Sequence, residues 1–293
     1  INESGKNVTL EMFSSFEMGN LSPFLPGDGV GSLLVPRILS KWSHEGRLVT
    51  ERIEDMQLEP SWSTWSVAVE RFGQRGSMPV MRYFPFAAVE DETSHVTWGV
   101  QLAHEASWQL EIYRQDDGLH LSGGLADREF GDWMKTVKPG ERFETPSAIL
   151  SVCEGGIDDI CHRLVSAGNK YVNAGPESEQ DLPVIFNEYC TTWGNPSHEN
   201  ICQILESIKD KGFDYFVIDC GWFKEDGVPW DISMGDYNIS KTLFPEGVEK
   251  TVGAIRQNGM KPGIWFEIDN VGRAAKAYEL TDHLLKRDGY PLT

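Results

Sequence analysis

The sequence predicts an antiparallel β-sandwich followed by the beginning of a (β/α)8 barrel. Three observations lead to this fold class. Short runs of alternating apolar and polar residues, separated by turn-forming clusters, fill the first half of the chain. A polar segment rich in helix- and strand-breaking residues lies near residue 180. Beyond it, short apolar runs alternate with stretches of helical spacing, which is typical of a parallel sheet.

The predicted sandwich occupies residues 1–155. Its alternating runs include "NVTLEMF", "RLVTERIEDMQL", "HVTWGVQLA" and "WQLEIYRQ", whose period of two indicates half-buried strands. The clusters "PGDGVG", "GQRGSMP", "QDDGLHLSGG" and "KPGE" are expected to be the turns between them. The chain opens with Ile1 and not with Met, so we expect a processed, trimmed or N-terminally incomplete sandwich.

Residues 156–182 are expected to form a linking helix and a linker. The helix is predicted from apolar residues at helical spacing, namely Ile157, Ile160, Cys161, Leu164 and Val165. The segment "NAGPESEQDLP" that follows is polar and contains two prolines, which indicates a domain boundary near residue 180.

Residues 183–293 are predicted to contain three strand–helix units. The strands are "PVIFNEY", "FDYFVID" and "PGIWFEI". Ser197 is a suitable cap for the first helix, which Gly212 would end, and Gly259 would end the second helix. The stretch "RAAKAYELTDHLLKRDG" is expected to be the third helix.

The polar ends of these strands favour a barrel over a doubly wound sheet. The strands end at Asn187, Asp219 and Glu267, and no G-x-G-x-x-G motif follows any of them. A dinucleotide-binding fold is therefore disfavoured. In a barrel, the carboxyl ends of the strands meet at one mouth and form the site. Three units cannot close a barrel of eight, so we expect the barrel to be truncated after the third unit.

Composition narrows the possible partners. The net charge of −19 disfavours nucleic acids and anionic membranes, and it is compatible with a neutral substrate. No apolar run approaches the roughly 20 residues that span a bilayer.

The five cysteines show no C-x-x-C spacing, so we expect neither a disulfide framework nor a metal site. We therefore expect a cytoplasmic location. Ten Trp and fourteen Phe suit core packing, and also a cleft in which rings stack on sugars.

Asp219 follows the second predicted barrel strand and precedes two aromatic residues. One interpretation is a turn-forming or helix-capping aspartate. The other is a binding residue, whose carboxylate accepts hydrogen bonds from sugar hydroxyls while Trp222 and Phe223 cover the apolar face of the sugar.

The stretch "FVIDCGWFKEDG…MGDYNISKTLFPEGVEKTVGAIRQNGMKPGIWFEIDNVG" resembles the opening of the catalytic barrel of glycoside hydrolase family 36, the melibiase-type α-galactosidases. The upstream segments "SSFEMGNLSPF", "SWQLEIY" and "KPGERFETPSAIL" resemble the N-terminal β-sandwich of that family. The resemblance covers nearly the whole chain. It implies a retaining enzyme that removes terminal α-linked galactose, or a related sugar, from oligosaccharides or glycoconjugates.

The resemblance also implies a set of substrate-binding residues. Asp219 matches the first of two family aspartates that hold the 4- and 6-hydroxyls of galactose, and Cys220 stands in place of the second. A thiol is a weak hydrogen-bonding group, which puts strict galactose specificity in doubt. The other positions that match site residues of the family, some with a different residue, are Tyr189, Trp222, Tyr237, Trp265 and Glu267.

Each of these residues also has a purely structural interpretation. Trp265 is a candidate core residue, and Tyr237 could pack beneath a loop. Glu267 could pair with a base such as Arg273. Cys220 could be a buried packing residue, and no His or Lys lies next to it in the sequence to activate the thiol.

A retaining mechanism needs two carboxylates about 5–5.5 Å apart. The resemblance places the nucleophile in a K-W-D-type motif on the fourth strand and the acid/base on a later strand, and both are expected beyond Thr293. We therefore expect no catalytic residue in this chain, no cofactor and no metal. The family also suggests a homo-oligomer, often a tetramer. An α-N-acetylgalactosaminidase and a non-catalytic carbohydrate-binding homologue remain alternatives.

Overall fold

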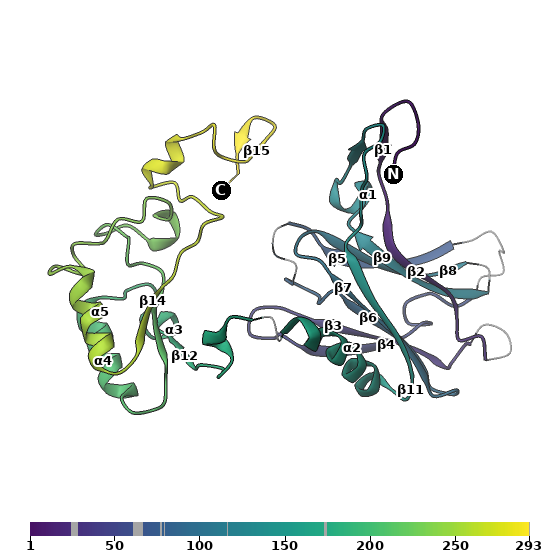
Figure 1. The fold of residues 1–293 in the computed structure, drawn as a ribbon, viewed down its shortest axis with the longest axis horizontal. Helices are drawn as coiled ribbons and strands as arrows, with labels where there is room; N and C mark the ends of the chain where they lie inside the picture. The colour runs from purple at the N-terminus through teal and green to yellow at the C-terminus, as the bar shows by residue number, and fades with distance from the viewer. Residues whose placement is uncertain are drawn as a thin grey trace. The chain divides into compact units, whose positions relative to one another are not determined.

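The computed structural model describes residues 1–24, 29–60, 67–76, 78, 80–115, 117–172 and 175–292. The predicted turns "PGDGVG", "GQRGSMP" and "QDDGLHLSGG" lie partly outside these residues. The chain divides into two compact units, Ile1–Ala174 and Gly175–Thr293. Figure 1 shows the large antiparallel sheets of the first unit and the smaller sheet of the second.

The first unit is a sandwich of two antiparallel sheets, as the alternating runs predict. One sheet has the strand order β11 (Ser147–Glu154), β7 (Val96–Ala103), β6 (Phe86–Asp91), β3 (Leu33–Leu39) and β4 (Arg47–Arg52). The other has the order β2 (Ser14–Leu21), β9 (Gly118–Leu125), β8 (Trp108–Gln115) and β5 (Val67–Gln74). Most of the predicted turn "QDDGLHLSGG" is therefore strand β9, because its Leu119 and Leu121 alternate into the core.

The core of the sandwich lies between the two sheets. Trp108, Leu110 and Ile112 point inward from β8 and have no exposed surface. They pack with buried residues of the opposite sheet, among them Val89 and Val100. This alternation stabilises the sandwich, because each inward side chain contributes about 1.5–3 kcal/mol on burial.

Three smaller elements complete the first unit. Strand β1 (Val8–Leu10) pairs with β10 (Lys135–Val137), and α1 (Arg128–Gly131) precedes β10. Helix α2 (Ile157–Val172) packs on β7 and β11 through Ile160 and Leu164. Gly99 permits this approach, because a Cβ there would lie 2.5 Å from the Cγ1 of Ile160. Val165, expected on the buried face of this helix, is 60% exposed instead.

The second unit contains a parallel sheet with the order β12 (Ile185–Asn187), β13 (Tyr215–Ile218) and β14 (Lys261–Ile264). Helices α3 (Tyr189–Thr192) and α4 (His198–Ile208) lie between the first two strands in the chain. The turn η2 (Trp230–Ile232) and helix α5 (Val248–Gln257) lie between the second and the third. Ser197 caps α4 as predicted, since its hydroxyl accepts the N–H of Asn200 at 3.1 Å.

The predicted third helix is wrong. Its segment contains a 3₁₀ turn, η3 (Lys276–Glu279), followed by a hairpin of β15 (Lys286–Arg287) and β16 (Tyr290–Pro291). Leu280 and Leu285 are 56% and 78% exposed, so the helical pattern has no surface to pack against. Asp288 and Gly289 both have positive φ, which is the turn geometry that a tight hairpin favours.

No helix in the described part of the chain is long and apolar enough to cross a membrane.

Arg37 connects the two sheets of the sandwich. Its side chain is 8% exposed and extends from β3, pairing with Glu51 on β4. Its Nη1 also lies 3.3 Å from the Oε1 of Glu70 on β5, in the other sheet. The guanidinium lies over the ring of Phe72, 5.2 Å from its centroid.

We expect Arg37→Met to lower the free energy of unfolding by about 1–3 kcal/mol, because two carboxylates lose a largely buried cation. The matched control is Arg52→Met, also on the five-stranded sheet. Its pair with Glu92 is 45% and 44% exposed, so a change of about 0–1 kcal/mol is expected. Urea denaturation measures both. Equal losses in the two variants would contradict the bridging role of Arg37.

Candidate functional site

Asp219 lies directly after strand β13, at the carboxyl end of the parallel sheet, and is 8% exposed. Asn187 ends the neighbouring strand β12, and its Nδ2 donates to the Oδ2 of Asp219 at 2.6 Å. The Oδ1 of Asn187 accepts the N–H of Tyr189 at 2.9 Å. The parallel register thus brings both strand ends together and fixes one oxygen of the Asp219 carboxylate.

Glu188 lies beside Asp219 and is completely buried. Its Oε1 accepts the backbone N–H of Asp219 at 2.8 Å, and its Oε2 accepts the hydroxyl of Thr192. Burial raises the pKa of Glu188, the charge of Asp219 raises it further, and the two hydrogen bonds oppose the shift. Glu188 could be placed at the end of a strand from the sequence, but its contact with Asp219 could not.

Cys220 is 1% exposed and belongs to the core of the second unit. Its N–H donates to the Oδ1 of Asp219 at 2.6 Å. Burial raises the pKa of the Cys220 thiol, and the neighbouring Asp219 carboxylate raises it further through its charge and a side-chain hydrogen bond. This enclosure favours the packing interpretation of Cys220 over direct contact with a sugar.

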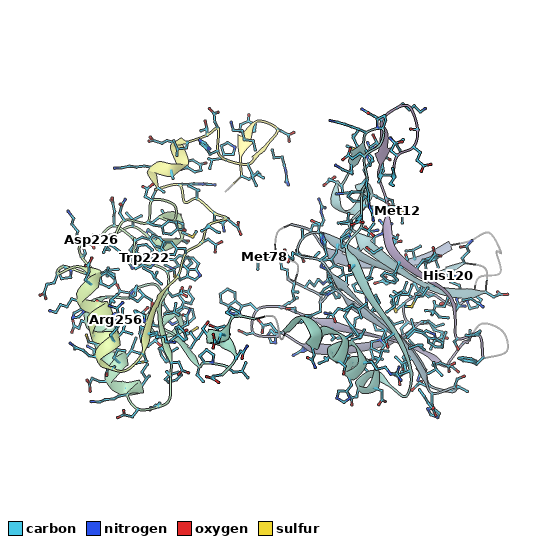
Figure 2. The ribbon with its side chains drawn as sticks, viewed as in Figure 1. Met12, Met78, His120, Trp222, Asp226 and Arg256 are labelled. Atoms are coloured by element: carbon cyan, nitrogen blue, oxygen red, sulfur yellow. The ribbon has the colours of Figure 1, made fainter. Side chains whose placement is uncertain are left out.

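Trp222 is the centre of an aromatic cluster made of Trp222, Phe223, Tyr237 and Phe266. Its ring stacks on Tyr237, with centroids 5.7 Å apart, and Phe223 and Phe266 contact it edge to face. Its Nε1–H donates to the carbonyl of Trp265 at 2.9 Å. The side chain lies inside the second unit (Figure 2) and is 2% exposed.

The structure buries both Trp222 and Phe223, and their covering of a sugar stays a prediction. Phe223 is 5% exposed, so neither side chain offers an open ring face. Both rings belong to the hydrophobic core of the second unit, where they pack against other aromatic rings. The Trp222 indole N–H also donates to a backbone carbonyl, so its polar group is paired.

Tyr237 fixes the backbone that carries Glu267. The Tyr237 hydroxyl donates to the carbonyl of Glu267 and accepts its N–H at 3.1 Å. Tyr237 is partly buried with a φ of 49°, and burial raises its pKa. These bonds hold the main chain of Glu267, not its carboxylate, and Glu267 is itself partly buried.

Tyr189 and Trp265 belong to a second line of rings, which also contains Trp193 and Trp230. Tyr189 contacts Trp193 and Trp230 edge to face, and Trp230 contacts Trp265 in the same way at 6.4 Å. Asn187 links Tyr189 to Asp219, since its amide accepts the Tyr189 N–H and donates to the Asp219 carboxylate. Burial raises the pKa of Tyr189. Trp193 is 68% exposed. The structure thus groups Tyr189 with Asp219.

Gly221, in the motif "DCGW", lies where two loops approach too closely for a side chain. It has a φ of 92°, and a Cβ there would lie 2.2 Å from the carbonyl oxygen of Gly194. Gly194 in turn has a φ of 79°, and a Cβ on it would lie 2.4 Å from the ring of Trp230. The loops after β12 and β13 therefore pack directly against each other.

A cavity of about 330 Å³ lies beside this region in the second unit. Its lining includes Lys224, Asp226, Asp236 and Lys241, but not Asp219. Asp236 is already engaged, since its carboxylate accepts the N–H groups of Lys276 and Ala277. Among the residues that the structure describes, no group of His, Cys, Asp or Glu side chains is arranged to hold a metal.

Comparison with known proteins identifies relatives across the whole chain. Residues 142–292 match the family model described as Melibiase. Alpha-galactosidase Mel36A of Lactobacillus acidophilus is 26% identical over 70% of this chain and 28% of its own length. Probable alpha-galactosidase G of Emericella nidulans is 22% identical over 100% of this chain and 39% of its own length. The chain thus spans less than half the length of these relatives.

Solved structures agree with the fold. The GH36 alpha-galactosidase AgaA from Geobacillus stearothermophilus superposes with a TM-score of 0.77, at 18% identity, over 100% of this chain and 38% of AgaA. The alpha-galactosidase from Lactobacillus brevis gives a TM-score of 0.74, at 21% identity, over 98% of this chain and 36% of its own. Because the family model covers more than half of the residues, the chain belongs to the melibiase family.

Proposed function

We propose that this chain is the β-sandwich and the first part of the (β/α)8 catalytic barrel of a retaining glycoside hydrolase. The enzyme removes terminal α-linked galactose, or a related sugar, from oligosaccharides or glycoconjugates. The observation that carries the proposal is Asp219, held by Asn187 at the carboxyl end of a parallel strand, where the family binds its sugar. The relatives named as alpha-galactosidases support it.

The barrel assignment is supported by the second unit. Its three strands are parallel, and each lies next to its neighbour in the chain, as in the wall of a barrel. The buried residues of α4 and α5 pack on the same core as Phe216 and Ile218 of β13. A closed barrel would need strands beyond these three.

The catalytic carboxylates are proposed to lie in sequence other than this chain. Glu188 and Asp219 are neighbours, but Glu188 is completely buried and its Oε1 is occupied by a backbone N–H. It therefore cannot approach an anomeric carbon, and Asp219 alone does not supply the two carboxylates of a retaining mechanism. Asp219 is a binding group in this proposal.

Two structures of variants of the Geobacillus enzyme AgaA hold raffinose and stachyose. We extend this substrate class to the present protein. The sugar is proposed to be galactose or a related sugar such as N-acetylgalactosamine. All five cysteines are free thiols, which is compatible with the proposed cytoplasmic location, and a homo-oligomer is proposed from the family alone.

The complete protein that contains this chain is expected to hydrolyse p-nitrophenyl α-galactoside, whereas residues 1–293 alone are not, because the proposal places the nucleophile outside them. Release of nitrophenol measures both. Turnover by the isolated chain, after contaminating glycosidases are excluded, would refute the placement of the catalytic carboxylates. Galactose binding without hydrolysis by the complete protein would favour a non-catalytic homologue.

In the complete protein, Asp219→Ala is expected to lower kcat/KM by roughly tenfold to 150-fold, because a sugar hydroxyl loses a hydrogen bond to a charged acceptor worth about 1.5–3 kcal/mol. Steady-state kinetics on the same galactoside measures the effect. The control is Asp282→Ala, whose side chain is 98% exposed and which should leave kcat/KM unchanged. A loss below threefold for Asp219→Ala would remove this residue from the site.

Cys220→Asp is expected to destabilise the protein, not to retune its specificity, because it places a third carboxylate beside Asp219 and Glu188 in a buried position. An uncompensated buried polar group costs about 1–3 kcal/mol, and a charged one more. The measurements are the Tm and the ratio of kcat/KM for galactosides and N-acetylgalactosaminides, with Cys220→Ser as control. A changed ratio at an unchanged Tm would return Cys220 to the sugar pocket.

A further inference from the structure

Glu188 is a buried acid that the proposed reaction leaves without a role. Its two polar partners in the described chain are the N–H of Asp219 and the hydroxyl of Thr192, and neither carries a charge. The nearest charge that acts on it is the carboxylate of Asp219, which has the same sign. A carboxylate buried beside another carboxylate is costly, so packing alone does not explain it.

We propose that Glu188 is the positioning residue that fixes Asp219 for sugar binding. This inference rests on the proposed function, because Asp219 is taken to be the residue that contacts the sugar. Glu188 itself touches neither the sugar nor the reacting atoms.

The backbone geometry explains why a side chain is needed at this point. The N–H of Glu188 donates to the carbonyl of Val217 at 3.3 Å, as in a parallel ladder. The chain then turns, with φ −85° and ψ −4° at Glu188, to start α3. The carbonyl of Glu188 consequently accepts the N–H groups of Thr191 and Thr192, at 2.9 and 3.1 Å.

The N–H of Asp219 is left without the carbonyl that a continuing ladder would offer. The Glu188 carboxylate takes that place and accepts this N–H at 2.8 Å. An unpaired N–H in a buried strand end would cost about as much as a lost hydrogen bond, and the end of β13 would be free to move. Glu188 thus continues the ladder by one bond beyond the last residue of β12.

Asn187 complements this bond by holding the side chain of the same aspartate. Glu188 fixes the backbone N–H of Asp219 and Asn187 fixes its Oδ2, so the two residues form an Asp219 clamp. The Thr192 hydroxyl holds the other oxygen of Glu188 from the end of α3. The orientation of Asp219 therefore depends on three residues that follow one another from the end of β12 to the end of α3, namely Asn187, Glu188 and Thr192.

The experiment uses the complete protein and a double-mutant cycle between Glu188→Ala and Asp219→Ala. If Glu188 acts through Asp219, Glu188→Ala lowers kcat/KM about tenfold or more in the wild-type background and changes it less than about threefold in the Asp219→Ala background. A merely structural role would give the same fold-loss in both backgrounds, and that result would overturn the proposal.

Two further variants keep the test decisive if Glu188→Ala does not fold. Glu188→Gln keeps an acceptor for the Asp219 N–H and a donor for the Thr192 oxygen, so it is expected to retain kcat/KM within about threefold. Thr192→Val removes one support of Glu188 and is expected to reduce kcat/KM by a smaller factor that again disappears in the Asp219→Ala background. Loss of activity in Glu188→Gln together with additive loss in Thr192→Val would overturn the clamp.

Glu199→Gln is the matched control, because this glutamate is exposed in the first turn of α4, and no effect is expected. A readout independent of activity is the pH dependence of unfolding. The pKa of folded Glu188 is raised, so its contribution to stability is present below its unfolded pKa and is lost as the pH rises through the folded value. Glu188→Gln should therefore gain stability relative to the wild type as the pH rises.

The charge that enters this comparison is that of Asp219, directly after β13, whereas the Cys220 thiol stays neutral because its pKa is raised. An unchanged stability difference between pH 4 and pH 8 would show that Glu188 is not the buried ionisable group of the clamp. A wild-type protein that neither hydrolyses galactosides nor binds galactose would overturn the proposed function. An active wild type with additive variants would overturn the clamp alone.

Discussion

Parallel pairing of β12 with β13 is the constraint on which the candidate site depends. The register places Asn187 opposite Val217, so the residues that follow each strand emerge at the same edge of the sheet. Asn187, Glu188 and Asp219 meet there through hydrogen bonds of 2.6 and 2.8 Å. A shift of one residue in this register would turn Asp219 to the opposite face and separate it from both partners.

The aromatic residues near Asp219 have two different roles. Trp222 and Phe223 are buried, and the Trp222 indole and the Tyr237 hydroxyl hold the loops after β13 and β14 together. Tyr189 and Trp193 are less buried, and Tyr189 lies close to Asp219. The aromatic residues therefore include a buried set, centred on Trp222, and an exposed set, to which Trp193 and Phe266 belong.

Structural features that depend only on residues close together in the sequence could be predicted from it. Ser197 caps α4 because a hydroxyl before an amphipathic run needs only its own helix, and the alternating runs gave antiparallel strands because their period is local. The position of Asp219 at a strand end was predicted for the same reason. The family resemblance added the order of the motifs, which periodicity alone could not supply.

Features decided by tertiary contact could not be predicted. The segment at 273–289 has helical spacing, but Leu280 and Leu285 find no surface, so a short turn and a hairpin form instead. The burial of Trp222 and Cys220 depends on rings that are distant in the sequence. The place of Glu188 after a strand could be predicted, but its bond to Asp219 could not, because that bond depends on a carbonyl that α3 withdraws from the ladder.

The contact between Gly194 and Gly221 has a consequence for how this sequence can change over time. A Cβ on Gly221 would meet the backbone of Gly194, and a Cβ on Gly194 would meet the ring of Trp230. The two constraints differ in kind, because a ring can be exchanged for a smaller side chain whereas a backbone carbonyl cannot. Loss of Trp230 would therefore relieve the crowding at Gly194 alone, and Gly221 should be the glycine that descendants of this chain keep.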